Sequence, residues 1–500
     1  MTSFTFSRQV TWPAAQVRRA AMPALLASGL WLAGCAQTPP YERPSMDIPA
    51  AYKEQAAAQA QGIWKPAQPQ ASTALPETWW TVYGDAVLDR LQQQAEANSP
   101  TLAQSAARLR AAQAAVTSSG AAALPTVGAN ASSSRARSGT QLSSQGDGST
   151  TARISTSHSL GLTASWELDL WGRVSAGVSA AQASAQASAD DLAAARLSLQ
   201  AAVAQTYFSL RAAEAQAALL GETLKAYDRS WELTRNRQAA GVASSADVAQ
   251  AEAQYKSTQV QLLEAQTTRS QVEHALAALL GQAPAAFALE PTAALPAPAD
   301  VPQALPSDLL QRRPDIAVAE RRVAAANAQI GVARAAYFPT LTLSAAGGYR
   351  GAPLADLFSA PNLFWSLGPA LAASIFDGGA RSAAVETARA NHAQVTAAYR
   401  QTVLTALQEV EDNLTAAAAL AQEEQLQREA TAAAQRALDV VENQYRAGTV
   451  GYLNVLAAQT TVLSSQRSLI DVRSRRLVAV NTLLKNVAGR WESAESYQKQ

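Results

Sequence analysis

The chain has 500 residues, is rich in alanine and carries a formal net charge of only +1. A charge this close to neutral gives no electrostatic basis for binding nucleic acid. The sequence has one cysteine, so no disulfide can form within the chain and stability must come from packing or assembly. Proline is absent from residues 126–283 and 370–500, and such stretches favour very long helices.

The N-terminal segment 1–34 has the features of a secretory signal peptide. Two arginines precede a short apolar run, and small residues follow it. The stretch LAGC at 32–35 resembles the bacterial lipobox, in which the cysteine thiol is lipidated and becomes the first residue of the mature protein. The alternative is an ordinary signal peptide with an incidental cysteine. We predict lipidation of Cys35, because this cysteine is unique and lies where the apolar run ends. Ala36 stands where inner-membrane lipoproteins often carry Asp, so we also predict an outer-membrane location.

After the signal peptide, the sequence has no run of 18 or more apolar residues that could form a transmembrane helix. A membrane-spanning part would therefore have to use β-strands. Residues 35–84 are predicted to be the lipid anchor and an irregular N-terminal arm, because much of this segment is rich in Pro, Ala and Gln. A helix is expected from Asp85 to about residue 120.

Two strands are then predicted at about 126–134 and 157–170, joined by a flexible loop that includes 138–151. In the second strand, apolar and small polar residues alternate strictly, which indicates a strand with one apolar face. The residues on the predicted apolar face are Leu160, Leu162, Ala164, Trp166, Leu168 and Leu170.

A long helix is predicted from about 174 to 240, with a coiled-coil-like apolar seam in its second half. At 1.5 Å per residue, such a helix reaches about 100 Å. Gly241 is expected to end this helix, and Ser245 to cap a returning helix that lasts to about residue 281.

After a Pro-rich connector at 282–306, the same order of elements returns. The elements expected in the second half are a helix at 307–336, strands at about 340–349 and 364–376, a helical tract at 380–447, a turn at Gly448, a last helix that ends near Gly489, and a polar tail at 490–500. The chain is therefore predicted to hold two tandem repeats, 85–281 and 307–489. Each repeat has a helix, a β-hairpin, a long helix and a returning helix.

The four predicted strands cannot close a barrel, and open strand edges are not tolerated in lipid. Closure therefore requires several chains. Two chains would give eight strands with a filled interior, whereas three would give twelve strands and a passable lumen. An ordinary sheet packed on helices would also show alternation, but it would not explain the lipid anchor, the repeated hairpins and the long helices together.

Five motifs bear a resemblance to a known family: Trp79-Trp80 with Tyr83, WELDLWGR at 166–173, the segment that begins RRPDIAVAERR at 312, IFDGGARSA at 375–383, and YRAGTVGYLNVLAAQ at 445–459. Over nearly the whole mature chain, the sequence resembles the TolC-like outer membrane efflux proteins, in particular the lipidated subgroup that serves resistance-nodulation-division (RND) pumps. The resemblance implies a mainly α fold with a β-barrel part. It also implies a homotrimer with a twelve-stranded outer-membrane β-barrel, joined to a long α-helical tunnel in the periplasm.

The same resemblance implies a passive exit duct for small toxic compounds or drugs. Its partners would be a periplasmic adaptor (membrane fusion) protein, an inner-membrane RND pump and outer-membrane lipid. The channel of a type I protein secretion system is an alternative, but such channels are usually not lipidated, so Cys35 favours the pump. A periplasmic coiled-coil tether is a non-transport alternative, which would need the helices but not the hairpins.

The resemblance further places functional residues at two helix-turn-helix tips, which in the family narrow the periplasmic entrance and dock the adaptor. The matching residues are Arg237, Gly241, Asp247 and Val248 at the first tip, and Tyr445, Gly448, Leu453, Asn454 and Val455 at the second. Many relatives are acidic where this chain has Asn454 and Ala457. Asp247 is therefore the candidate for a charged constriction. The alternative for the two glycines is that they only cap helices.

No motif for catalysis or for cofactor binding is found in the sequence. His158, His274 and His392 lie on separate predicted elements, without metal-ligand spacing. Neither a Gly-rich phosphate loop nor a nucleophile elbow is present. We therefore predict no enzymatic activity, no cofactor and no metal, which argues against a lipoprotein cell-wall hydrolase.

Overall fold

The computed structural model describes residues 38–62, 64–65, 78–137, 154–302, 306, 310 and 312–488. The predicted signal peptide, Cys35, the loop at 138–151 and the C-terminal tail lie outside these residues. The helices are α2 (Gln55–Ala60), α3 (Ala86–Asn98), α4 (Pro100–Ala121), α5 (Arg173–Ala239), α6 (Ser245–Leu279), α8 (Pro314–Ala335), α9 (Ala380–Arg446) and α10 (Tyr452–Val487). Short 3-10 helices are η1 (Trp79–Tyr83), η2 (Pro284–Ala286) and η3 (Ala360–Asn362). The strands are β1 (Trp64–Lys65), β2 (Thr126–Arg137), β3 (Ile154–Leu168), β4 (Val301–Pro302), β5 (Thr340–Gly351) and β6 (Leu363–Ala372).

The predicted order of elements is confirmed in both halves of the chain. In each half, a helix leads into a β-hairpin, then into a helix of 67 residues, α5 or α9, and then into a shorter returning helix, α6 or α10. The repeat boundaries 85–281 and 307–489 remain predictions. The chain forms two compact units, and each unit takes segments from both repeats. The first unit contains the hairpins, within Ala111–Ala185 and Arg322–Thr396, and the second contains the paired helices that end in the turns.

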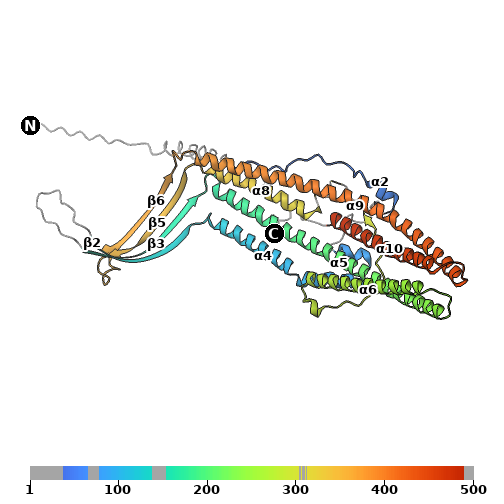
Figure 1. Ribbon diagram of the computed structural model, residues 1–500. Helices are drawn as coiled ribbons and strands as arrows, with labels where there is room; N and C mark the ends of the chain where they lie inside the picture. Colours follow the sequence, from blue (N-terminus) through green and yellow to red (C-terminus); the bar gives the residue numbers. More distant parts are fainter. Residues whose placement is uncertain are drawn as a thin grey trace, which may run out of the picture. The chain divides into compact units, whose positions relative to one another are not determined.

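The first unit is built around a four-stranded antiparallel sheet in the order β2-β3-β5-β6 (Figure 1). The β3–β5 pair joins the hairpin of one repeat to the hairpin of the other. Within the part of the chain that the structure describes, the outer edges of β2 and β6 pair with no strand. This sheet therefore has two open edges, each able to pair with another strand.

The register of the sheet gathers the alternating apolar residues of all four strands on one face. Leu162 lies opposite Ala129 on β2 and Gly347 on β5, and Gly347 lies opposite Trp365 on β6. Side chains in register share a face. The large members of this apolar face are Val127, Ile154, Leu160, Leu162, Trp166, Leu168, Leu341, Leu343, Tyr349, Leu363, Trp365, Leu367 and Leu371. Leu162 is 60% exposed and Trp365 78% exposed, so nothing in the described chain covers the middle of this face.

The opposite face carries mostly small polar residues and glycine. Its β3 and β5 members are Ser155, Ser157, Ser159, Gly161, Thr163, Ser165, Glu167, Thr340, Thr342, Ser344, Ala346, Gly348 and Arg350. The predicted alternation on β3 is therefore confirmed, and the sheet extends it across four strands. An apolar face and a small polar face on one sheet are what a wall between lipid and water requires.

Two predicted strands continue past the C-terminal ends that the structure gives them. The second hairpin strand was expected to reach residue 376, but β6 ends at Ala372, opposite Thr340, where its partner β5 begins. Without a partner strand the ladder stops, and Ile375 and Phe376 are then 96% and 90% exposed. In the same way β3 ends at Leu168, so Leu170 lies beyond the sheet.

The WELDLWGR motif ties the end of β3 to the start of α5. Glu167 accepts two hydrogen bonds from Arg173, at 2.8 and 2.7 Å. The carboxylate of Asp169 accepts from the backbone N–H groups of Val174 and Ser175 and so satisfies two free donors of the first helical turn. Trp171 stacks on Phe338, with ring centroids 4.9 Å apart. These contacts explain why a strand-to-helix switch requires this dense group of polar and aromatic residues.

The first predicted helix is broken in two. The sequence was expected to form one helix from Asp85 to about residue 120, but α3 ends at Asn98 and α4 begins at Pro100, with Ser99 in an extended conformation between them. Proline lacks a backbone N–H, and its ring pushes the preceding residue out of the helical region. Pro100 therefore starts a second helix rather than continuing the first.

The core of the second unit lies where η1 and α3 pack against α5. Trp79 is 1% exposed, and its indole Nε1 donates to Gln200 Oε1 at 3.0 Å. Tyr83 packs edge-on against Phe208, with centroids 4.8 Å apart, and burial raises the pKa of the Tyr83 hydroxyl. The aromatic motif that precedes the first helix thus packs this segment against α5. The predicted apolar seam of α5 is buried at Leu199, Val203, Leu210, Leu220 and Tyr227.

A buried ionic network holds the Pro-rich connector to α5 and α6. Glu214 is only 1% exposed at its side chain, and Arg211 Nη1 donates to its carboxylate at 2.6 Å. Arg269 lies 3.3 Å from the same carboxylate. Glu214 also accepts the backbone N–H of Thr292, while Arg211 donates to the carbonyl of Glu290. Both connector residues are therefore held by one buried ion pair.

The basic segment near residues 467–476 ties α10 to α9. Arg473 and Arg476 lie 3.1 and 2.8 Å from the carboxylate of Glu424, which is 8% exposed at its side chain. Arg475 pairs with Glu423 at 2.8 Å. This charge run therefore forms contacts between helices rather than a solvated face.

Asp190 on α5 is a buried carboxylate with an unusual titration. Burial, together with the negative charges of Glu320 and Asp191, raises its pKa to about 7, although Arg321 acts in the opposite direction. The folded protein therefore keeps a proton that the unfolded chain releases near pH 4. The contribution of this group to stability is fully present below pH 4 and is lost as the pH rises towards 7.

We expect Asp190→Asn to be as stable as the wild type at pH 4 and more stable by a few kcal/mol at pH 8, at about 1.4 kcal/mol per unit of pKa shift. Thermal unfolding followed by circular dichroism across this pH range measures the difference. A difference between the two proteins that does not change with pH would contradict the assignment.

Among the described residues, no helix is both long and apolar enough to cross a membrane. The same residues contain no group of three or more His, Cys, Asp or Glu side chains arranged to hold a metal ion.

Candidate functional site

The site predicted from the sequence consists of the two turns that join α5 to α6 and α9 to α10. In the first turn, Gly241 N–H donates to the carbonyl of Gln238 and Val242 N–H to the carbonyl of Arg237, both at 2.9 Å. In the second turn, Gly448 and Thr449 make the equivalent pair of bonds at 3.0 Å. This double pattern is the Schellman motif, which satisfies the last carbonyls of a helix. The two repeats thus end their long helices in the same way.

Both turns require glycine for its backbone conformation and not for space. Gly241 has a φ of 76° and Gly448 a φ of 77°, values that residues other than glycine rarely adopt. A Cβ atom at either position would meet nothing within 4 Å. The helix-capping role of both glycines is therefore established by the geometry, and a further role at the tip is compatible with it.

Asp247 lies in the first turn of α6 and takes part in its N-terminal cap. Its carboxylate accepts from the Ser244 backbone N–H at 3.0 Å and from the Ser244 hydroxyl at 2.8 Å. The Ser244 hydroxyl in turn accepts from the Asp247 N–H, which completes a capping box. The prediction of Ser245 as the cap was wrong by one residue. The reciprocal bond to Asp247 requires the cap three residues before it, and that residue is Ser244.

Arg237 and Tyr445 bring the two turns together, although 208 positions separate them in the chain. Arg237 Nη1 donates to the carbonyl of Tyr445 at 3.3 Å. The guanidinium carbon also lies 4.5 Å from the centre of the Tyr445 ring, a cation–π geometry. Two of the predicted site residues are therefore direct partners.

An apolar cluster lies behind this contact. Its buried members are Ala251, Tyr445, Tyr452 and Val455, and Trp231, Val441, Val450 and Leu456 pack against them. Tyr445 is only 8% exposed, and its ring meets that of Tyr452 edge-on at 5.7 Å. Within one chain, Tyr445 is thus a core residue of the paired tips.

Tyr452 is a contributor that the sequence analysis did not single out. It is 2% exposed, its hydroxyl accepts from Ser230 at 3.4 Å, and burial raises its pKa. The signal in the sequence is an aromatic residue at the first position of α10, directly after the Gly448 turn. That position faces the neighbouring hairpin, and only the fold reveals this neighbour.

The remaining predicted residues lie at the surface of the tips. Leu453 is 61% exposed, Asn454 is exposed and Val248 is half-buried. Ala457, one turn further along α10, is exposed as well. A groove of about 330 Å³ lies beside this cluster and is lined by Ala226, Arg229, Ser230, Leu233, Glu442, Tyr445, Arg446, Val455 and Gln459. Among the predicted site residues, the large exposed apolar side chain is therefore that of Leu453, not that of Tyr445.

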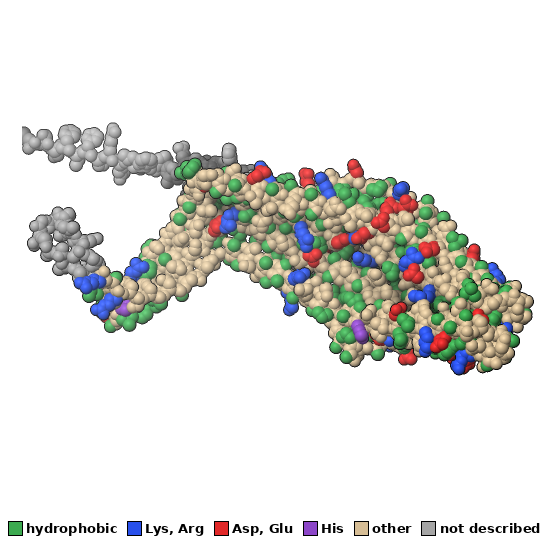
Figure 2. Space-filling model, viewed as in Figure 1, with side chains coloured by type: hydrophobic (Ala, Val, Ile, Leu, Met, Phe, Trp, Pro, Cys, Tyr) green, Lys and Arg blue, Asp and Glu red, His purple; other side chains and the backbone are tan. Residues whose placement is uncertain are grey.

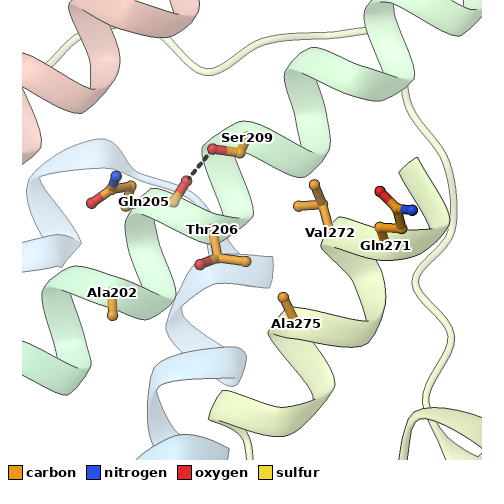
Figure 3. Close-up of a pocket in the computed structure, with 7 residues that line it drawn as sticks. All are labelled: Ala202, Gln205, Thr206, Ser209, Gln271, Val272 and Ala275. Atoms are coloured by element: carbon orange, nitrogen blue, oxygen red, sulfur yellow. Dashed lines mark hydrogen bonds between the residues drawn. The ribbon is translucent and has the colours of Figure 1, made fainter. Parts of the chain in front are cut away.

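A second depression, of about 450 Å³, lies between α5 and α6 (Figure 3). It is lined by Ala202, Gln205, Thr206, Ser209, Gln271, Val272 and Ala275, none of which is charged. The Ser209 hydroxyl is already bonded to the carbonyl of Gln205 at 3.0 Å. Since none of its lining residues is titratable, we describe this depression only as a groove between packed helices.

The tips can act sterically and electrostatically. They combine a buried aromatic core, an arginine that joins the two hairpins, an exposed leucine and a carboxylate close to the turn. Side chains of these kinds suit a constriction or a docking surface.

The sequence matches the model of one protein family, described as outer membrane efflux protein, over residues 91–282 and again over 305–489. The chain is similar to the probable efflux pump outer membrane protein TtgC of Pseudomonas putida, with 34% identity over 461 residues, which cover 92% of this chain and 93% of that protein. It is also similar to the outer membrane protein OprJ of Pseudomonas aeruginosa, with 33% identity over 470 residues, which cover 93% and 95% of the two chains. Among solved structures, it resembles the outer membrane protein VceC of Vibrio cholerae, with a TM-score of 0.75 and 31% identity over 83% of this chain and 99% of that one.

Proposed function

Because this chain belongs to the outer membrane efflux protein family, we propose that it is the passive exit duct of a tripartite efflux pump. It is an outer-membrane component of an efflux system, and the proposal concerns how it works. Three copies join their four-stranded sheets into one barrel of twelve strands, whose lumen continues into a tunnel formed by α5, α6, α9 and α10. Small toxic compounds or drugs leave the cell through this duct.

One observation carries the proposal: a sheet with two open edges, one apolar face and one face of small polar residues. Open edges must be paired in lipid, so the sheet needs copies of itself. Twelve strands leave a lumen, and the Ser, Thr and Gly side chains of the polar face leave room for water in it. The chain supplies no transport energy of its own in this mechanism, and it has no catalytic role.

The partners follow from the kind of pump. We propose that an inner-membrane RND pump delivers the substrate and that a periplasmic adaptor protein contacts the paired tips. The similar protein TtgC is described as an efflux pump outer membrane protein, which supports an efflux pump over a type I secretion system. We further propose that Cys35 is lipidated and holds the mature N-terminus at the outer membrane, as its lipobox-like sequence suggests.

Arg237, Gly241, Asp247, Val248, Tyr445, Gly448, Leu453 and Asn454 are proposed to form the periplasmic entrance. The two glycines give the turns their backbone conformation, and the hydrogen bond from Arg237 to Tyr445 joins the two hairpins. Leu453 supplies exposed apolar bulk near the threefold axis. Asp247 supplies a ring of three carboxylates in addition to capping α6.

The test is single-channel recording of the purified protein in planar bilayers. We expect Leu453→Ala to increase conductance, because three bulky side chains are removed from the narrowest part of the duct. Asp247→Asn is expected to decrease cation preference, measured as a smaller reversal potential in a salt gradient, because three carboxylates leave the ring.

Two controls separate these effects from damage to the tip. Ser244→Ala removes the capping bond but keeps the carboxylate, so selectivity should persist while α6 loses about 1 kcal/mol. Tyr445→Ala should instead loosen the whole tip, because its ring is buried. If the wild type forms no channels and stays monomeric, the duct proposal is wrong. If only the selectivity of Asp247→Asn is unchanged, that residue is a cap and no more.

A further inference from the structure

Basic side chains gather at the end of the sheet where the strands meet their connecting loops (Figure 2). On β2 these residues are Arg135 and Arg137, and the neighbouring strand β3 adds His158. The other end of the sheet is where α4 leads into β2 and β3 leads into α5. The basic group therefore lies at the end farther along the strands from these helices.

The register places these three side chains on the apolar face of the sheet. Arg135 lies opposite Thr156, Arg137 opposite Ile154, and Ser133 opposite His158. Even-numbered positions of β3 form the apolar face, which includes Leu160 and Leu162. Arg135 and Arg137 are thus about 7 Å apart along one strand, and His158 is diagonal to Arg135 at roughly 7–8 Å. By contrast, Arg350 lies opposite Ser159 and so belongs to the polar face.

The depth of this group follows from the strand length. β3 has 15 residues, whereas a tilted strand crosses the hydrocarbon layer in about 9–11. Beyond Leu160, the apolar face of β3 carries only one more large apolar residue, Ile154 at the end of the strand, and Arg135 is paired four positions beyond Leu160. At about 3.3 Å per residue, its Cα lies roughly 13 Å past Leu160 along the strand. The group therefore lies above the apolar band, at the level of lipid headgroups.

Among the described residues, the side chains of Arg135, Arg137 and His158 make no hydrogen bond or ion pair, and both arginines are exposed. Unpaired arginines beside lipid are costly unless a headgroup neutralises them. The planar guanidinium fork matches phosphate oxygens, and basic clusters beside an apolar surface recognise anionic lipids. Phosphate on a lipid whose acyl chains lie along Leu160, Leu162 and Trp365 would meet both requirements.

We propose that Arg135, Arg137 and His158 form a binding site for the phosphorylated glucosamine headgroup of lipid A, the membrane anchor of lipopolysaccharide in the outer leaflet. This inference rests on the proposed duct, which places the loop end of the sheet at the outer leaflet. The site adds a specific lipid contact, on the outside of each protomer, to the anchor at Cys35.

The experiment uses the assembled full chain in detergent micelles and measures lipid retention by native mass spectrometry. The probes are lipid A with both phosphates, lipid A with both phosphates removed, and phosphatidylglycerol. We expect bisphosphorylated lipid A to bind at least tenfold more tightly than the other two. The double variant Arg135→Gln/Arg137→Gln should lose about tenfold or more of this affinity. Arg350→Gln, at the same end but on the other face, should lose none.

Several results would overturn the site. These are equal binding of the dephosphorylated lipid, equal binding of phosphatidylglycerol, displacement of the lipid by millimolar inorganic phosphate, or an equal loss in Arg350→Gln. Conductance of the same samples separates this inference from the duct. A double variant that conducts normally and keeps its lipid A affinity disproves the lipid site alone. A wild type that neither assembles nor conducts disproves the duct, and the lipid site with it.

Discussion

Replacing Leu162 by arginine is expected to destabilise the membrane-inserted protein by about 2–4 kcal/mol per chain. Leu162 lies in the middle of the apolar face, in one row with Ala129, Gly347 and Trp365, and is 60% exposed. A charged side chain at this depth must leave water for hydrocarbon. Since three copies carry the change, the cost to a trimer is about 6–12 kcal/mol. Semi-native gel electrophoresis over a temperature series would show the trimer dissociating at a much lower temperature.

The matched control is Ser165→Arg on the same strand. Ser165 is exposed and lies opposite Thr126 and Ser344, on the small polar face. Its arginine would extend into the lumen, so we expect little loss of trimer stability and a change in conductance. If the two variants dissociated at the same temperature, the assignment of the two faces would be wrong. Trp166, Leu343 and Leu371 lie on the same face as Leu162. Replacing any of them by arginine should therefore destabilise the trimer as Leu162→Arg does.

The second large effect is expected from Glu214→Ala, which should cost about 3–5 kcal/mol. The glutamate is 1% exposed at its side chain, and its removal leaves Arg211 buried, at 5% exposure, without its ion-pair partner. The Thr292 N–H loses its acceptor as well. The apparent free energy of unfolding, from guanidinium titration in micelles followed by helical circular dichroism, measures the loss. Limited proteolysis should also show faster cleavage in the connector at 282–300.

Glu423→Ala serves as the comparison. Glu423 pairs with Arg475 at 2.8 Å, but both side chains are about half exposed, at 47% and 50%. Exposed ion pairs contribute at most about 1 kcal/mol, and salt weakens them. Equal losses in the two variants would mean that burial is not what makes the Glu214 network matter.

The features that the sequence by itself determined are those set by neighbouring residues. Strict alternation from Leu160 to Leu168 is enough to define a strand with two unlike faces, because side chains alternate along a strand. Long stretches without proline produced two helices of 67 residues, and the glycines at 241 and 448 ended them. Even the break at Ser99 is encoded locally, since a residue before proline leaves the helical region.

Tertiary structure decided whatever depends on partners far apart in the chain. Pairing of β3 with β5 aligned the apolar residues of two repeats on one face, and alternation within a strand cannot specify which strand lies beside it. The sequence placed Tyr445 at the second tip, and only the fold shows that the hairpin that carries Arg237 and Trp231 covers it. One acceptor of Arg211, the carbonyl of Glu290, lies 79 positions away in a connector whose composition suggested only a linker. In each case the energy comes from a group brought near by folding, and its identity is absent from the local sequence.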